Sequence, residues 1–268
     1  MMKYLTKEWY LAVQNSYHHQ HLVSDERAAI FSEEYFLELY CASEQDHLDF
    51  HRSVCNLDRD ELVAKLTGTS SCHVDGSPLS KEEQNIVSSF QDAFAEALCT
   101  APEPVFDPEK EKLEYHRMFV RAFDQLKYMY PPEILEKVAD TRVLALEHAA
   151  PDVIAAIEQY CLQNRALADS RNEANRAEDQ KNWKNRKPAF FKDFYFHDNQ
   201  ILSMEMENSN AILTFDTNVA CRFKNAVILK CDCATENSIW LYNEIYPVAA
   251  GYEIHALLLG LQAGVVEG

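Results

Sequence analysis

The chain has 268 residues, of which 47% are hydrophobic and 25% charged, the composition of a folded protein and not of a disordered one. Its 43 acidic residues outnumber the 25 basic ones and give a formal net charge of −18, which disfavours binding to nucleic acid or to an anionic membrane surface. The six glycines do not form a Gly-x-Gly-x-x-Gly or P-loop motif, so the common phosphate-binding cofactor loops are excluded.

Helical spacing of apolar residues dominates the first 165 residues. We expect the early helices at 7–17, at 32–41 and, in one or two pieces, at 44–66, before a loop at 68–78. Four later helices have clear start signals, namely the Ser80–Glu83 capping box, Asp107-Pro108, Pro131-Pro132 and Pro151-Asp152. The helix that starts at Pro131-Pro132 is expected to continue through Leu144.

The pattern changes twice after residue 165. Large apolar residues almost vanish over 166–187, which predicts a charged helical extension or spacer. From Pro188 the period becomes two, and strand-like segments predict an antiparallel meander at 201–207, 211–216, 221–233, 238–246, 252–259 and an incomplete 264–268. Asn208-Ser209-Asn210 indicates a hairpin turn between the segments 201–207 and 211–216. The predicted fold class is therefore α+β, with a helical domain (1–165), the spacer (166–187) and an antiparallel β domain (188–268).

The first residues, the apolar runs and the cysteines of the chain bear on the cellular location of the protein. The first residues are charged where a signal peptide is apolar, and no apolar run reaches the roughly 18 residues of a membrane span. We therefore expect a cytoplasmic protein with reduced cysteines. Cys231 and Cys233 are the only close pair, and a structural zinc site usually needs two such pairs.

Two groups of residues in the helical half are candidate metal ligands. His19 and His21 can chelate a metal ion from an extended segment. Glu44, His47 and His51 share one face of a helix, the arrangement that metal-binding bundles use. A dinuclear carboxylate site needs a second Glu-x-x-His motif, which the sequence lacks. For both groups the other interpretation is a solvated polar surface.

The β region contains the third candidate site, formed by His197, Glu244, Glu253 and His255. Glu253 and His255 are two residues apart and so lie on one face of their strand, while Glu244 is on a neighbouring strand. If His197 converges on them, the carboxylates and imidazoles can bind a divalent metal or transfer protons. The other interpretation is structural, because the surrounding aromatic residues predict cross-strand packing in which polar neighbours only satisfy hydrogen bonds.

Four strings of residues resemble a family of bacterial proteins known only as a domain of unknown function. They are Met2-Lys3-Tyr4-Leu5-Thr6-Lys7-Glu8-Trp9-Tyr10, Phe196-His197-Asp198, Trp240-Leu241-Tyr242-Asn243-Glu244-Ile245-Tyr246 and Gly251-Tyr252-Glu253-Ile254-His255. The similarity covers nearly the whole chain, more loosely in the middle helices, and Leu5 stands where the family usually has an aromatic residue. The resemblance implies a cytoplasmic bacterial protein with a helical part and a β part, and it carries over no activity and no catalytic residue.

These observations together favour a non-enzymatic α+β binding protein. Its acidic surface suits a basic protein partner, and no cofactor is needed. The alternative is a metal-dependent hydrolase that uses His197, Glu244, Glu253 and His255 with a bound divalent metal ion.

Overall fold

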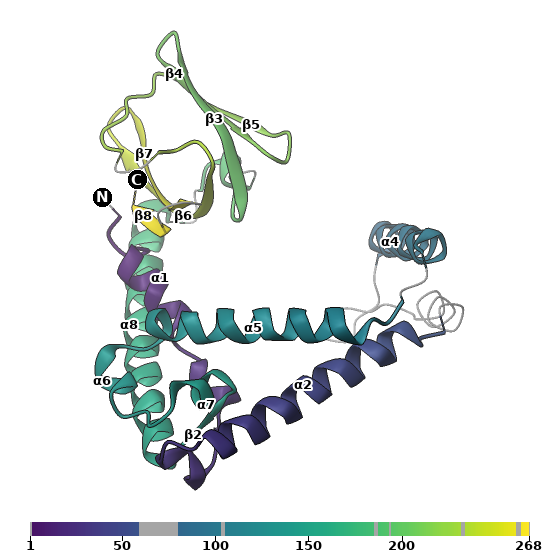
Figure 1. Cartoon of the computed structure of the whole chain (residues 1–268). Coiled ribbons are helices and arrows are strands. Elements are labelled where there is room, and N and C mark those ends of the chain that lie inside the picture. Colours follow the sequence, from purple (N-terminus) through teal and green to yellow (C-terminus); the bar gives the residue numbers. More distant parts are fainter. Residues whose placement is uncertain are drawn as a thin grey trace. The chain divides into compact units, whose positions relative to one another are not determined.

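The computed structural model describes residues 2–58, 80–102, 105–184, 187–192, 194–231, 234–260 and 264–267. The fold class is α+β, as the sequence predicts, with helices first and an antiparallel sheet near the C-terminal end (Figure 1). Two compact units divide the chain. The helical unit is Val23–Pro151, and the sheet unit combines Met1–Leu22 with Asp152–Gly268.

These units divide the chain differently from the predicted domains. The expected boundary at 165 falls inside α8, a continuous helix of 33 residues from Pro151 to Trp183. Ala168 is buried in this helix, and Asn172 accepts a hydrogen bond from the indole nitrogen of Trp9 at 3.1 Å. The small and polar side chains of 166–183 let the N-terminal segment pack closely. The segment predicted as a charged helical extension or spacer is therefore, up to Trp183, a continuation of α8, and it is part of the sheet unit.

The sheet unit contains three kinds of elements. Its helices are α1 (Lys7–Gln14), η1 (His18–His21), α8 and η3 (Ala189–Lys192). Its strands are β3 (Asn199–Glu207), β4 (Asn210–Phe215), β5 (Ala220–Phe223), β6 (Ser238–Val248), β7 (Gly251–Gly260) and β8 (Gly264–Glu267). The β3–β4 hairpin is confirmed, because Asn208 and Ser209 adopt the positive φ angles (49° and 66°) that its two-residue turn needs.

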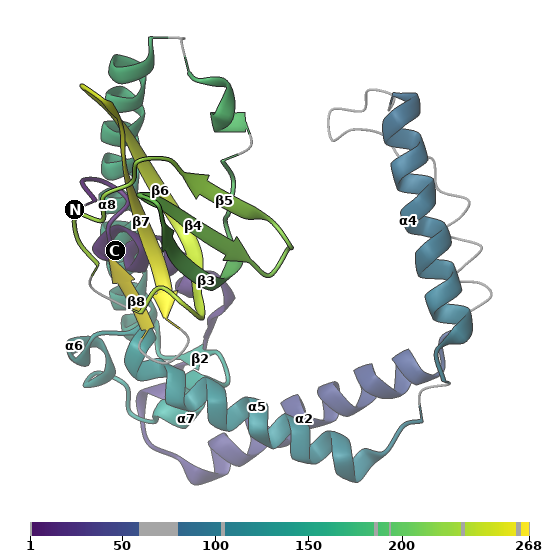
Figure 2. The ribbon, with the colours of Figure 1, turned by 90° about the horizontal axis from the view of Figure 1, so that it is seen from above.

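The strand order is β5-β4-β3-β6-β7-β8, and all neighbours are antiparallel (Figure 2). The predicted meander is wrong at one point, since β6 follows β5 in the chain but pairs with β3. The strand predicted over 221–233 is also shorter, because a turn at Asn225, where φ is 51°, follows the end of β5 at Phe223. Cys231 therefore lies outside any strand, and Cys233 lies outside the described residues.

The two faces of the sheet belong to two different hydrophobic clusters. One cluster joins α1, α8 and the sheet through Met2, Leu5, Trp9, Ala12, Ala168, Leu241 and Leu257. The other lies among the strands and contains Phe196, Ile201, Leu213, Phe215, Trp240 and Leu258. The N-terminal residues are therefore core residues of the sheet unit.

The helical unit is formed by β1 (Val23–Ser24), η2 (Glu26–Ala29), α2 (Glu33–Cys55), α4 (Lys81–Thr100), α5 (Pro108–Met129), α6 (Pro132–Leu135), α7 (Thr141–Ala145) and β2 (His148–Ala149). The start signals at Ser80 and Asp107 are confirmed as side-chain caps. The predicted break near residue 41 is wrong, because no glycine or proline interrupts α2. The predicted helix after Pro131 is divided in two, since the Asp140 side chain caps a new start there. The loop predicted at 68–78 lies outside the described residues.

Helices α2 and α5 run antiparallel (Figure 1) and contact each other through aromatic side chains. The ring centroids of Phe36 and Phe119 are 5.8 Å apart, and those of Tyr40 and Tyr115 are 5.1 Å apart. His47 continues the row at 5.6 Å from Tyr115. These contacts set which residues of the two helices lie opposite one another. No described helix has both the length and the apolar character that crossing a membrane requires.

Candidate functional site

The β-region candidate is partly assembled. Glu253 and His255 lie on one face of β7, and their Oε1 and Nε2 atoms are 2.6 Å apart. The hydrogen bond with His255 is the main cause of the lowered pKa of the Glu253 carboxyl group. Glu244 lies directly opposite His255 in the β6–β7 register. Three of the four predicted residues are therefore neighbours.

Glu244 has a structural environment. Its side chain is buried, and its two oxygens accept hydrogen bonds from the backbone N–H groups of Lys3, Tyr4 and Leu5 at 2.8, 2.7 and 2.6 Å. The Tyr246 hydroxyl donates a fourth at 2.5 Å, and burial, followed by this bond, raises the pKa of Tyr246. Both carboxylate oxygens are thus engaged in holding the N-terminal segment against β6.

His197 does not join this group. Its Nδ1 lies 2.8 Å from Asp198, and its ring is nearly perpendicular to that of Tyr242, with the ring centroids 4.7 Å apart. Among the residues that the structure describes, the four candidates do not form a set of three ligand atoms within metal-binding distance of one another. The geometry leaves a Glu253–His255 pair beside a structural carboxylate.

A small pocket adjoins this pair. It has a volume of about 230 Å³ and is lined by Lys3, Glu178, Asn182, Tyr246, Pro247, Val248, Glu253 and His255. Binding sites for small molecules usually enclose about 300–1,000 Å³, so this pocket is small for an organic substrate. What the pair can do chemically is exchange a proton between carboxylate and imidazole.

We expect His255→Ala to raise the pKa of the Glu253 carboxyl group towards its ordinary value of 4.5, because the hydrogen bond that stabilises the carboxylate is lost. The carboxyl carbon shift of Glu253 in an NMR titration measures this directly. Because the pKa of Glu253 is lowered in the folded chain, its contribution to stability is present above pH 4.5 in the wild type and is lost on acidification. An unchanged titration in the variant would contradict the assigned cause.

The histidine segment near the N-terminus differs from the expectation. Residues 18–21 form the 3₁₀ helix η1 and not an extended chelating segment. His18 Nε2 lies 2.9 Å from the Asn15 side-chain oxygen, and burial lowers the pKa of His18. His19 and His21 belong to no group of three potential ligands in the described parts of the chain.

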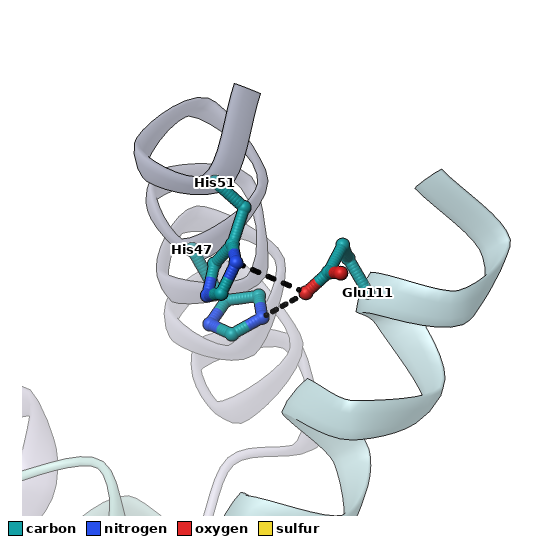
Figure 3. A group of neighbouring side chains, drawn as sticks. All are labelled: His47, His51 and Glu111. Carbon is teal, nitrogen blue, oxygen red and sulfur yellow. Dashed lines mark ion pairs between the residues drawn. The ribbon is translucent and has the colours of Figure 1, made fainter. Parts of the chain in front are cut away.

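The helical unit contains a group of potential metal ligands formed by His47, His51 and Glu111 (Figure 3). One ligand atom from each residue lies within 4.8 Å of the other two. Glu111 Oε2 is 3.4 Å from His47 Nε2 and 3.3 Å from His51 Nδ1. The side chains of His47 and Glu111 are 11% and 15% exposed, and that of His51 is 39% exposed. The group is therefore half-buried, and His51 is its most exposed member.

Local structure explains how these three residues meet. His47 and His51 are one turn apart on α2, so their rings lie side by side, tilted by 40° with their centroids 4.3 Å apart. The Asp107 cap starts α5 at Pro108 and places Glu111 in its first turn, where the helix dipole favours a carboxylate. The sequence identified the two histidines but missed Glu111, which is separated from them by 60 residues or more. Glu44, predicted with the histidines, is not a member of the group.

Comparisons with protein-family models, with curated proteins and with solved structures gave no match to this chain. The resemblance of its four strings to a bacterial family therefore stays a prediction, and the residues themselves are the basis on which a function is assigned.

Proposed function

We propose that this protein is a non-enzymatic binding protein whose helical unit recognises a basic protein partner. Residues 23–151 include 26 acidic and 12 basic residues, so this unit carries −14 of the total charge of −18. Such a charge accelerates the approach of a basic partner and disfavours acidic ones. The concentration of charge on one unit supports a role for that unit in recognition.

The main support for the proposal is a row of exposed apolar side chains on α4, the α4 stripe, formed by Ile86, Phe90 and Phe94. Ile86, Phe90 and Phe94 follow one another at four-residue intervals, and each side chain is more than half exposed. Asp92 and Glu96 are exposed on the same helix. An amphipathic helix with anchors at this spacing is a common means of binding an apolar groove on a partner. The acidic residues that accompany the stripe suit a groove bordered by lysine and arginine.

The test compares the wild-type chain with a Phe90→Ser/Phe94→Ser variant in affinity capture from a cell extract, with identification of the captured proteins. We expect a protein of basic isoelectric point that the variant binds at least about 10-fold more weakly, since exposed aromatic anchors dominate such interfaces. Raising the salt concentration from about 0.05 to 0.5 M is expected to reduce capture by the wild type, because screening weakens the charge attraction.

Two controls make this test specific. Phe50→Ser removes an equally exposed aromatic side chain from α2 and is expected to leave capture unchanged. The double variant is expected to unfold at the same temperature as the wild type, since its changes are at the surface. A large loss of stability in the double variant would mean that the stripe packs within the molecule, and would contradict a binding role.

The alternative, a metal-dependent hydrolase in the β region, has less support. Glu244 already accepts four hydrogen bonds, and His197 is paired with Asp198. Only Glu253 and His255 remain to act on a substrate, and the pocket beside them is small. The non-enzymatic proposal is therefore preferred.

A further inference from the structure

We propose that His47, His51 and Glu111 bind one divalent transition-metal ion, for which zinc is the best fit, and that this ion links α2 to α5. Two imidazole nitrogens and one carboxylate oxygen are a ligand set that zinc accepts, with a fourth position left for water. The site is separate from the α4 stripe, and the inference does not depend on the proposed partner.

The distances from the Glu111 carboxylate to the two histidine nitrogens fit a tetrahedral ion. Zinc lies about 2.0–2.2 Å from nitrogen and oxygen ligands, so two ligands of one tetrahedron are separated by about 3.4 Å. The separations from Glu111 Oε2 to the two histidine nitrogens are 3.4 and 3.3 Å. Both are longer than the roughly 2.7–3.2 Å of an ordinary N–H···O hydrogen bond. Glu111 is thus spaced from each of the two histidines as two ligands of one ion are.

His47 gives a second, independent indication that this group binds a metal ion. Its Nε2 atom is buried and has no hydrogen-bond partner among the described residues, although it faces Glu111 (Figure 3). An unsatisfied buried nitrogen costs free energy, and polar atoms in this state usually have an ordered water or an ion as a partner. Coordination of a metal ion satisfies this nitrogen, the nitrogen of His51 and the carboxylate together.

The position of the group allows the ion to join the two helices near the ends where the chain leaves and re-enters the pair. α2 ends at Cys55 and α5 begins at Pro108, so His51 and Glu111 lie within one turn of the points where the chain leaves and re-enters the helix pair. An ion that joins them forms a cross-link across the ends of the segment 56–107, which contains α4. Cross-links that close long segments restrict the unfolded chain most strongly, and metal binding contributes directly to folding.

The experiment uses the untagged full-length chain, freed of metal with a chelator and titrated with zinc chloride and, separately, with cobalt(II) chloride. We expect one ion per chain and a rise of about 5–10 °C in the unfolding midpoint of the helical unit when the free ion is about 100 times its dissociation constant. The cobalt(II) spectrum is expected to show tetrahedral d–d bands without the charge-transfer band of a thiolate ligand.

Substitutions locate the ion. His47→Ala, His51→Ala and Glu111→Gln are each expected to weaken binding at least about 100-fold, since loss of even an outer partner of a ligand costs 10–100-fold. Three matched controls are expected to bind as the wild type does. His116→Ala and Glu114→Gln change the same type of residue elsewhere on α5, and His255→Ala removes the imidazole of the β-region pair.

Circular dichroism of the metal-free variants checks that α2 and α5 still form, so that a loss of binding is not a loss of folding. The proposal is overturned if the chain binds no ion, if binding survives the three ligand substitutions, or if His255→Ala abolishes it. A thiolate band in the cobalt spectrum would also overturn it, because the ion would then be held by cysteine.

Discussion

Glu244→Ala is expected to lower the free energy of unfolding of the sheet unit by about 3–5 kcal/mol, because a buried acceptor is removed while its donors remain. Three backbone N–H groups of the N-terminal segment and the Tyr246 hydroxyl all donate to this carboxylate. Each donor that is left without a partner destabilises the folded state, because it has been removed from water without a replacement hydrogen bond. The same bonds hold Leu5 and Trp9 in the cluster between α1 and the sheet, so their loss also weakens apolar packing.

Chemical denaturation followed by tryptophan fluorescence measures this effect, since all three tryptophans, at 9, 183 and 240, belong to the sheet unit. Tyr246→Phe is the matched control: it removes one donor and leaves the other three, and it is expected to cost only about 1 kcal/mol. Glu244→Gln is expected to lie between the two. Equal stabilities for Glu244→Ala and Tyr246→Phe would show that the N-terminal segment does not depend on the carboxylate.

Arg142→Ala is expected to have the second largest effect, a loss of about 2–4 kcal/mol in the helical unit. The guanidinium group lies 2.8 Å from the buried carboxylate of Asp140, donates to Glu33 at 2.8 Å, and covers the Phe36 ring at 4.2 Å. Removing it leaves the Asp140 charge buried and without its counter-charge, which costs more than the pair itself contributes. The substitution also removes the ion pair between Arg142 on α7 and Glu33 at the start of α2.

The chain offers a natural control for this change. Asp25-x-Arg27 repeats the arrangement at the surface, with Arg27 bonded to Asp25 and Glu38 and placed over Tyr35 at 4.3 Å. Since exposed ion pairs contribute little, Arg27→Ala is expected to change stability far less than Arg142→Ala. Far-UV circular dichroism, compared with tryptophan fluorescence, assigns the loss to the helical unit. Similar losses for the two variants would contradict the role of burial.

Local signals in the sequence correctly predict several elements. Ser80 with Glu83 and Asp107 with Pro108 marked two helix starts, and Asn208-Ser209 marked the hairpin turn. The spacing of two residues placed Glu253 and His255 on one face of β7, where they are hydrogen-bonded. In each case the determining interactions lie within a few residues of one another, so the local sequence contains them.

The α+β class, most helix and strand positions, and the side chains that share a face are thus predictable from the sequence alone. Three features depend on tertiary contacts: the pairing of β6 with β3, the hydrogen bonds from the N-terminal segment to Glu244, and the proximity of Glu111 to His47 and His51. The physical reason is that these contacts join residues 39 to 241 positions apart. Their partners are chosen by how whole helices and strands bury apolar surface together, and a periodic pattern along one element contains no information on which partner that will be.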